Sequence, residues 1–144
     1  METINPHAQV FREFKTTINE IVDLISNKEY VNDPDKVLAR VDKALYLIEQ
    51  CIEQVKEEIR KMKEKYAFKY GLGYFTRKKN RGYIYVVFRT YTKDKDIYLP
   101  RQEALKVLEL KERLSKLYKT RRKLREIKRE IRHYSSMAKY IYKL

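Results

Sequence analysis

The sequence predicts a mainly α fold with a small antiparallel β meander, in which a long antiparallel helical hairpin is joined by an N-terminal helix. Apolar residues recur at steps of three and four in three stretches of the chain, which is the spacing of amphipathic helices. Between the second and third stretches, aromatic and β-branched residues alternate with polar ones, which is the period of a strand. Gly71 and Gly73 separate the two patterns.

The first two helices have matching start signals. Asn5 is a favoured N-cap residue and Pro6 suits the first helical turn, so a helix is expected from Pro6 to about Asn27. Asp33 and Pro34 repeat the signal, and the helix that follows is expected to run to residue 66 with a coiled-coil seam on one face. The seam consists of Leu38, Val41, Leu45, Ile48, Ile52, Val55, Ile59, Met62 and Tyr66.

A β meander is expected next, beginning with the sequence GYFTRKKNRGYIYVVFRTY at residues 73–91. We predict strands at 74–77 and 82–91, joined by the turn RKKNRG, and a third short strand in the sequence DIYL. Asp94 is expected in the turn before that third strand. The residues expected to face the helices are Ile84, Val86, Phe88, Ile97 and Leu99, whereas Tyr83, Tyr85 and Arg89 are expected to point outward.

The chain length fits one domain, spanning residues 1–144. It would comprise two helices in 1–66, the basic β meander in 67–100 and a long basic helix in 101–144. Cys51, the single cysteine, excludes an internal disulfide and is expected as a small core residue beside the seam. No apolar run approaches the length of a membrane span, and the N-terminus has no secretory signal core. We therefore expect a protein of the cytoplasm or of a virion, without a membrane partner.

Charge is the strongest global feature, with a formal net charge of +14. Residues 1–65 hold 11 Lys and Arg against 13 Asp and Glu, whereas residues 66–144 hold 23 against 7. The charged fraction of 38% is typical of thermophilic proteins, but thermophily raises acids and bases together and does not explain this division. A positive field confined to one half of a chain favours binding to polyanions.

The last helix sorts its charges between faces. One face collects six cations without an acid, while Glu126 and Glu130 lie on the opposite side with Lys119 and Lys123. This face indicates a polyanion-binding stripe, although a solvated face that covers the seam with its methylene stems is the alternative. The six cations are Arg121, Arg122, Arg125, Lys128, Arg129 and Arg132.

The meander combines aromatic and cationic side chains. Residues 66–98 contain ten of the eighteen Phe and Tyr residues of the chain. Because aromatic rings can stack on bases while Lys and Arg neutralise phosphates, this combination indicates nucleic-acid binding. Tyrosines are also common in ordinary strands, so the signal is compositional. The candidate contacts here are Arg77, Lys78, Lys79, Arg81, Tyr83, Tyr85 and Arg89.

Signals of catalysis are weak. The sequence GLG at 71–73 follows a helix and lacks the Lys-Ser/Thr of a phosphate loop, so it predicts a helix stop rather than a nucleotide site. No set of residues has the spacing of metal ligands. We expect no enzyme activity, no cofactor and no metal.

Two resemblances accompany this pattern. The sequence GYIYVVFRTYTKDKDIYLPRQEALKVLEL, residues 82–110, resembles the arm-binding domains of phage-type integrases, which join a three-stranded sheet to a helix. It is also similar to short archaeal and archaeal-virus proteins with a Tyr-rich hairpin. Separately, the order helix, β element and helix over 34–138 resembles a prefoldin-type chaperone subunit. Neither resemblance assigns a site residue.

The sequence therefore favours a non-enzymatic nucleic-acid-binding protein of an archaeon or its virus or plasmid, with a role such as transcription regulation. DNA and RNA remain alternatives. A second hypothesis is a module that docks on an acidic protein surface, such as the nucleic-acid channel of a polymerase. A third is a virion nucleoprotein or coat subunit, and the helical seam could also join copies of the chain.

Overall fold

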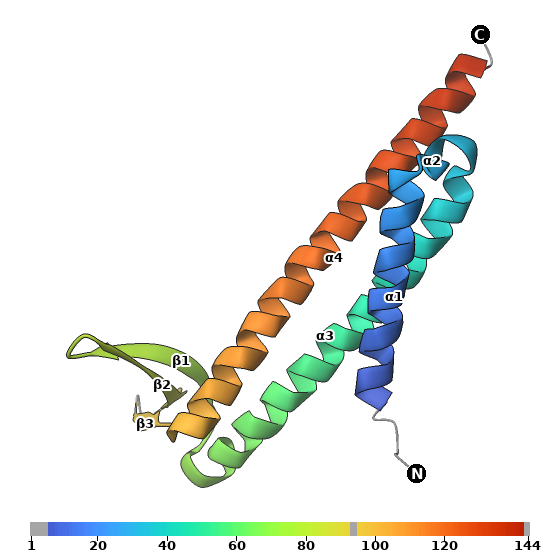
Figure 1. The fold of residues 1–144 in the computed structure, drawn as a ribbon. Coiled ribbons are helices and arrows are strands. Elements are labelled where there is room, and N and C mark those ends of the chain that lie inside the picture. The colour runs from blue at the N-terminus through green and yellow to red at the C-terminus, as the bar shows by residue number, and fades with distance from the viewer. Residues whose placement is uncertain (1–5, 93–94, 143–144) are drawn as a thin grey trace, which may run out of the picture. The chain divides into compact units, whose positions relative to one another are not determined.

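The computed structural model of the protein describes residues 6–92 and 95–142, and most of these residues are helical (Figure 1). A three-stranded antiparallel sheet accounts for the strands, so the predicted fold class, mainly α with a small β meander, is confirmed. The elements are α1 (Pro6–Ser26), α2 (Glu29–Asn32), α3 (Pro34–Tyr70), β1 (Gly73–Asn80), β2 (Tyr83–Thr90), β3 (Asp96–Tyr98) and α4 (Arg101–Tyr142).

The helix boundaries follow the local signals in the sequence. α3 runs four residues further than the seam and stops at Tyr70 because Gly71 adopts a positive φ of 101°, which glycine tolerates. The N–H of Gly71 donates a hydrogen bond to the Ala67 carbonyl oxygen at 2.8 Å. The short helix α2 was not predicted, because its segment has no apolar period. Asn5 and Asp94 lie outside the described residues.

The chain divides into two compact units. The first unit comprises Met1–Ile52 and Leu117–Leu144, and the second comprises Glu53–Lys116. Helices α3 and α4 each belong partly to the first unit and partly to the second. The sheet belongs to the second unit.

In the first unit, α3 buries a wider face than its seam. The seam residues Val41, Ile48 and Ile52 are fully buried, as predicted. A second stripe is buried beside them because α1 also packs in this unit, so α3 has more than one helix to cover. This second stripe consists of Val37, Ala44, Leu47 and Cys51, and α1 contributes Phe14, Thr17 and Ile21. Burial of Cys51 in this stripe agrees with its predicted role as a core residue.

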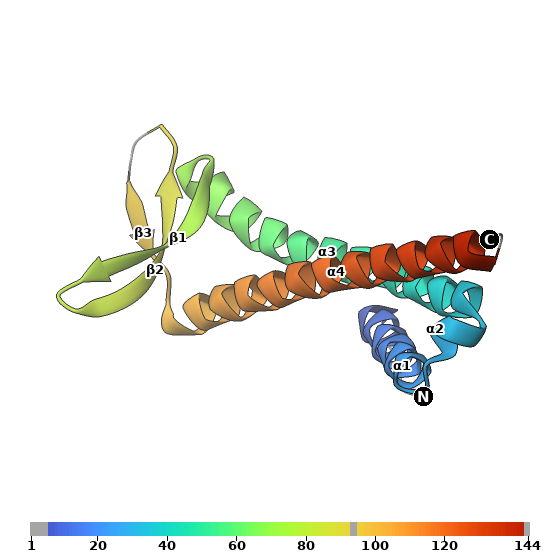
Figure 2. The same cartoon turned by 90° about the horizontal axis from the view of Figure 1, so that it is seen from above.

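In the second unit, the strand order is β1-β2-β3, and both pairs are antiparallel. Figure 2 shows the strands beside the end of α3 and the start of α4. One sheet face, which we call the inner face, packs on these helices through a core cluster. The cluster consists of Phe75, Val86, Phe88, Leu99 and Val107, with Ile59, Met62, Tyr66 and Ile97 among the residues packed against it.

Two residues of β2 lie on the predicted faces but differ from the expected burial. Ile84 was expected to face the helices in the core, but its side chain is 65% exposed because the hairpin continues beyond the part of the sheet that the core cluster covers. Val87 lies on the opposite face of the strand, with Tyr85 and Arg89, yet it is fully buried. It lies in the middle strand, directly between Thr76 of β1 and Tyr98 of β3.

The core cluster predicts a large effect for one truncation. Phe88 is fully buried, and its ring centroid lies 5.6 Å from Phe75 and 5.5 Å from Tyr66. Replacing it in Phe88→Ala leaves a cavity, so we expect a loss of about 3–5 kcal/mol in the free energy of unfolding, measured by urea denaturation. The exposed ring of Tyr83 is the control, and Tyr83→Ala should change stability by well under half of that loss. Equal effects would contradict the assigned core.

Candidate nucleic-acid interface

The β1–β2 hairpin closes through a turn of two residues. Asn80 pairs with Tyr83, so the loop consists of Arg81 and Gly82 alone. Both have positive φ, 52° and 83°, as the type I′ turn requires. The turn is therefore shorter than the predicted RKKNRG, and the three cations at 77–79 lie on β1.

This register separates the cations of β1 between the two sheet faces. Lys78 lies opposite Tyr85 on the outer face, the face away from the core cluster. Arg77 and Lys79 are on the inner face, because side chains alternate along a strand. The three neighbouring cations thus have different surroundings.

On the outer face, two candidate cations share one carboxylate. Asp96 of β3 accepts from Lys78 Nζ at 2.6 Å and from Arg89 Nε at 2.7 Å. Its side chain is only 14% exposed, and the hydrogen bonds from Arg89 and then Lys78 hold the pKa of this carboxyl well below its usual value. Tyr98 packs edge-on against Tyr85 beside them. Lys78 and Arg89 therefore take part in tying β1 and β2 to β3.

The end of the hairpin remains exposed. Tyr83, Ile84 and Tyr85 are 69%, 65% and 42% exposed. Lys79, opposite Ile84 on the inner face, and Arg81 in the turn are exposed as well, and neither forms an ion pair within residues 6–92 and 95–142. Figure 1 shows that this end of the hairpin projects away from α3 and α4 of its own unit. Aromatic, aliphatic and cationic side chains thus meet on an uncovered ribbon.

The inner face holds a cation that sequence reasoning missed. Lys111 of α4 donates a hydrogen bond through Nζ to the Phe75 carbonyl oxygen at 2.7 Å. Arg77 and Lys63 are close enough to lower the pKa of its ammonium group, after the larger effect of burial. The signal that could have found it is positional, since Lys111 follows the buried Val107 by one helical turn.

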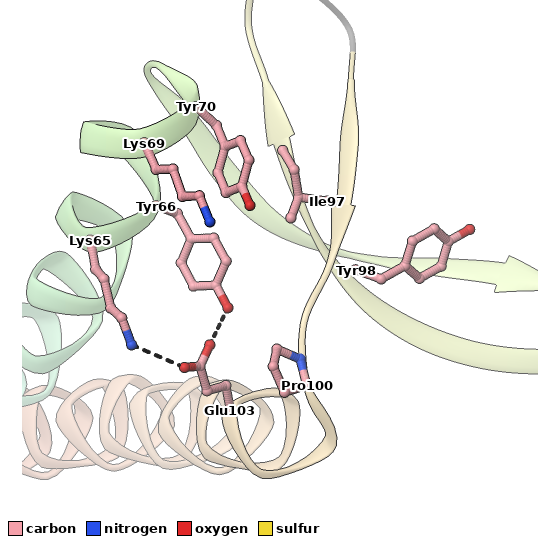
Figure 3. Close-up of a pocket in the computed structure, with 8 residues that line it drawn as sticks. All are labelled: Lys65, Tyr66, Lys69, Tyr70, Ile97, Tyr98, Pro100 and Glu103. Atoms are coloured by element: carbon pink, nitrogen blue, oxygen red, sulfur yellow. Dashed lines mark hydrogen bonds and ion pairs between the residues drawn. The ribbon is translucent and has the colours of Figure 1, made fainter.

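A hollow of about 290 Å³ lies where α3, β3 and α4 meet in the second unit (Figure 3). The hydroxyl of Tyr66 and the ammonium of Lys65 both donate to Glu103, and Lys65 Nζ lies 3.2 Å from the carboxylate. Figure 3 shows Lys69 Nζ beside the rings of Tyr66 and Tyr70, and it lies 5.3 Å from the Tyr70 centroid. Because Lys65 and Tyr66 of α3 both donate to it, Glu103 bridges α3 and α4.

In the first unit, half of the cationic face of α4 is paired with acids of α3. Arg121 Nη1 lies 2.8 Å from the Glu49 carboxylate, Arg125 lies 3.8 Å from the same group, and Lys128 Nζ lies 2.6 Å from Asp42. The helical wheel of α4 alone could not show these partners. The remaining cations are exposed and have no ion pair within the described part of the chain; they are Arg122, Arg129 and Arg132.

Two further features of the described residues concern metal sites and membrane-spanning helices. Across residues 6–92 and 95–142, no group of three His, Cys, Asp or Glu side chains is placed to hold a metal ion. None of the helices in this part of the chain is long and apolar enough to span a membrane.

Comparison with known proteins yields no relatives. No protein-family model matches the sequence, and neither the curated proteins nor the solved structures include a significant match.

The Tyr66–Glu103 bridge predicts a measurable pKa change. The hydrogen bond from Tyr66 is the first cause, and Lys65 a further one, that lowers the pKa of Glu103 below 4.5. A lowered carboxyl pKa contributes stability above about pH 4.5 that is lost as pH falls. We expect Tyr66→Phe to raise the Glu103 pKa toward 4.5, which NMR titration of the carboxyl group measures. The variant should also lose less stability on acidification than the wild type.

The neighbouring Tyr70 offers the control for this titration. It packs on Tyr66 without a hydrogen bond to Glu103, so Tyr70→Phe should leave the Glu103 pKa unchanged. A Glu103 pKa that is the same in wild type and Tyr66→Phe would contradict the bridge.

Proposed function

We propose that this chain binds nucleic acid without catalysing a reaction, and that the end of the β1–β2 hairpin makes the main contact. The observation that carries the proposal is the exposed set of Tyr83, Ile84 and Tyr85 beside Lys79 and Arg81. Exposed rings on one face of the hairpin end, with cations in the turn and on the other face, suit the two parts of a nucleotide, because bases stack on rings and phosphates attract cations. A two-stranded ribbon also has the width to enter a major groove.

The electrostatics of the second unit support this proposal. It contains 18 Lys and Arg against 9 Asp and Glu. Several of those carboxylates are already held, as Asp96 is by Lys78 and Arg89, and Glu103 by Lys65. The excess positive charge therefore concentrates on the groups that lack such partners. A polyanion would be drawn to them over a distance of about one Debye length.

The cationic face of α4 has a secondary role in this proposal. Arg122, Arg129 and Arg132 are free to contact phosphates. Arg121 and Lys128 would first have to leave Glu49 and Asp42, which costs part of any gain from a new contact. We therefore expect substitutions of Arg122 and Arg129 to weaken binding more than substitutions of Arg121 and Lys128.

Salt dependence tests the proposal. If the hairpin and the free arginines make about six phosphate contacts, the log–log slope of affinity against salt is near −5 for duplex DNA. Arg81→Gly removes one contact at a position where positive φ suits glycine, so the slope should fall by about 0.9 without loss of stability. Fluorescence anisotropy with duplex and single-stranded DNA and RNA measures this, with the exposed Arg12→Gln as the control.

Affinity that does not change with salt would contradict nucleic-acid binding. A partner that survives nuclease treatment of a pull-down would favour an acidic protein surface instead.

Asp96 supplies a second test. Asp96→Asn removes the carboxylate that holds Lys78 and Arg89, so both cations become available on the outer face. We expect tighter binding with a steeper salt slope, together with a less stable sheet. Asp42→Asn in the first unit is the matched control, because it removes the partner of Lys128, which lies outside the hairpin. Weaker binding by Asp96→Asn in a protein that is still folded would contradict the main role of the hairpin.

A further inference from the structure

Two lysines of the second unit occupy helix positions that normally carry apolar side chains. Lys63 of α3 follows Ile59 by four residues and precedes Tyr66 by three, and both neighbours pack against the core cluster. Lys111 of α4 follows the buried Val107 by four residues. Residues three and four apart share one helix face, so both lysines lie on faces turned toward the core.

The free edge of β1 brings a third cation to them. β1 is an edge strand, and Lys111 Nζ contacts it through the Phe75 carbonyl oxygen at 2.7 Å. Arg77 follows Phe75 by two residues, so its side chain leaves β1 on the same inner face. Three elements thus direct cations toward one place beside the strand edge.

The charges in this cluster are uncompensated. Burial lowers the pKa of Lys111 below 10.5 although the residue as a whole is exposed, and the positive charges of Arg77 and then Lys63 lower it further. No carboxylate in the described part of the chain acts on Lys111 to oppose them. Glu57 and Glu64, on α3 itself, are bound by Arg60. Three like charges without an acid destabilise a fold, and a bound anion removes that cost.

We propose that Lys63, Arg77 and Lys111 form a phosphate-binding site at the free edge of β1, filled by a phosphodiester of nucleic acid. The inference rests on the proposed function and adds a site that the hairpin end does not include. Arg77 offers a planar fork for two phosphate oxygens, and the two ammonium groups supply point charges. The exposed edge gives a strand of nucleic acid access to them.

Thermal unfolding tests the site with inorganic phosphate as the probe. A ligand that binds only the folded state raises the melting temperature, and at ten times its dissociation constant it shifts the folding equilibrium about elevenfold. We compare sodium phosphate with sodium chloride at equal ionic strength. The wild type should show a larger rise in phosphate than Lys63→Gln or Lys111→Gln.

Matched controls lie on the same helices. Lys61→Gln and Lys106→Gln each remove one exposed lysine, so they should keep the wild-type rise, including the general stabilising effect of phosphate as a salt. Equal rises in all five proteins would overturn the site. Lys111→Arg keeps the charge and should retain most of the rise, which guards against loss of folding in Lys111→Gln. NMR of the lysine side chains gives a direct readout, because phosphate should raise the pKa of Lys111.

Oligonucleotide binding identifies the source of the phosphate. If a phosphodiester fills the site, Lys111→Gln should reduce the log–log salt slope for duplex DNA by about 0.9 relative to Lys106→Gln. Equal slopes in these two variants would overturn the phosphodiester as the occupant of the site and leave the proposed function standing. If the wild type binds no oligonucleotide, both the proposed function and the phosphodiester as occupant are overturned. In that case, a rise in melting temperature with phosphate that is lost in Lys111→Gln would assign the site to free phosphate.

Discussion

The contact of three aromatic rings supports the second unit. Tyr66 of α3 packs on Phe75 of β1 and Phe88 of β2, with ring centroids 5.7 Å and 5.5 Å apart. These rings hold both strands of the hairpin on the helices at one end, so the other end can extend without cover. Large rings bury much apolar area from few residues, and a sheet of three short strands needs that area to be stable. The exposure of Tyr83 and the position of Lys111 both depend on this attachment.

The ion pairs of Asp96 and Glu103 lie in the same region, where the sheet is attached to the helices. Near the attached end of the sheet, Asp96 binds Lys78 and Arg89, and Glu103 binds Lys65 and the Tyr66 hydroxyl. These carboxylates lie between elements and join them. The cations without an ion pair in the described part of the chain include Lys79 and Arg81 at the hairpin end and Lys63, Arg77 and Lys111 beside the edge of β1. Asp96 and Glu103 of the second unit therefore stabilise the fold by joining its elements. The excess positive charge of the unit remains on the side chains outside these pairs.

Periodicity predicted α1, α3 and α4 because each has an apolar face longer than three turns, and the start signals at Pro6 and Pro34 located two of their ends. It also predicted burial of Ile48 and Cys51. It overestimated the burial of Ile84, since alternation gives the face of a strand but not how far a helix covers it. The partners of Arg121 and Lys128 were invisible for a similar reason, because Glu49 and Asp42 lie more than 70 residues away in the chain. Contacts of that kind exist only after folding.

The two-residue turn has a consequence for how the hairpin could change. It fixes which residues of β1 and β2 stand opposite each other, and a shift of one residue would move every side chain of one strand to the other face. Lys78 would then lose Asp96, while Arg77 would turn away from Lys111. The length of this loop thus determines which cations of β1 pair with carboxylates of the protein and which stay available to a ligand. One inserted residue at Arg81 would exchange those assignments without altering the composition of the strands.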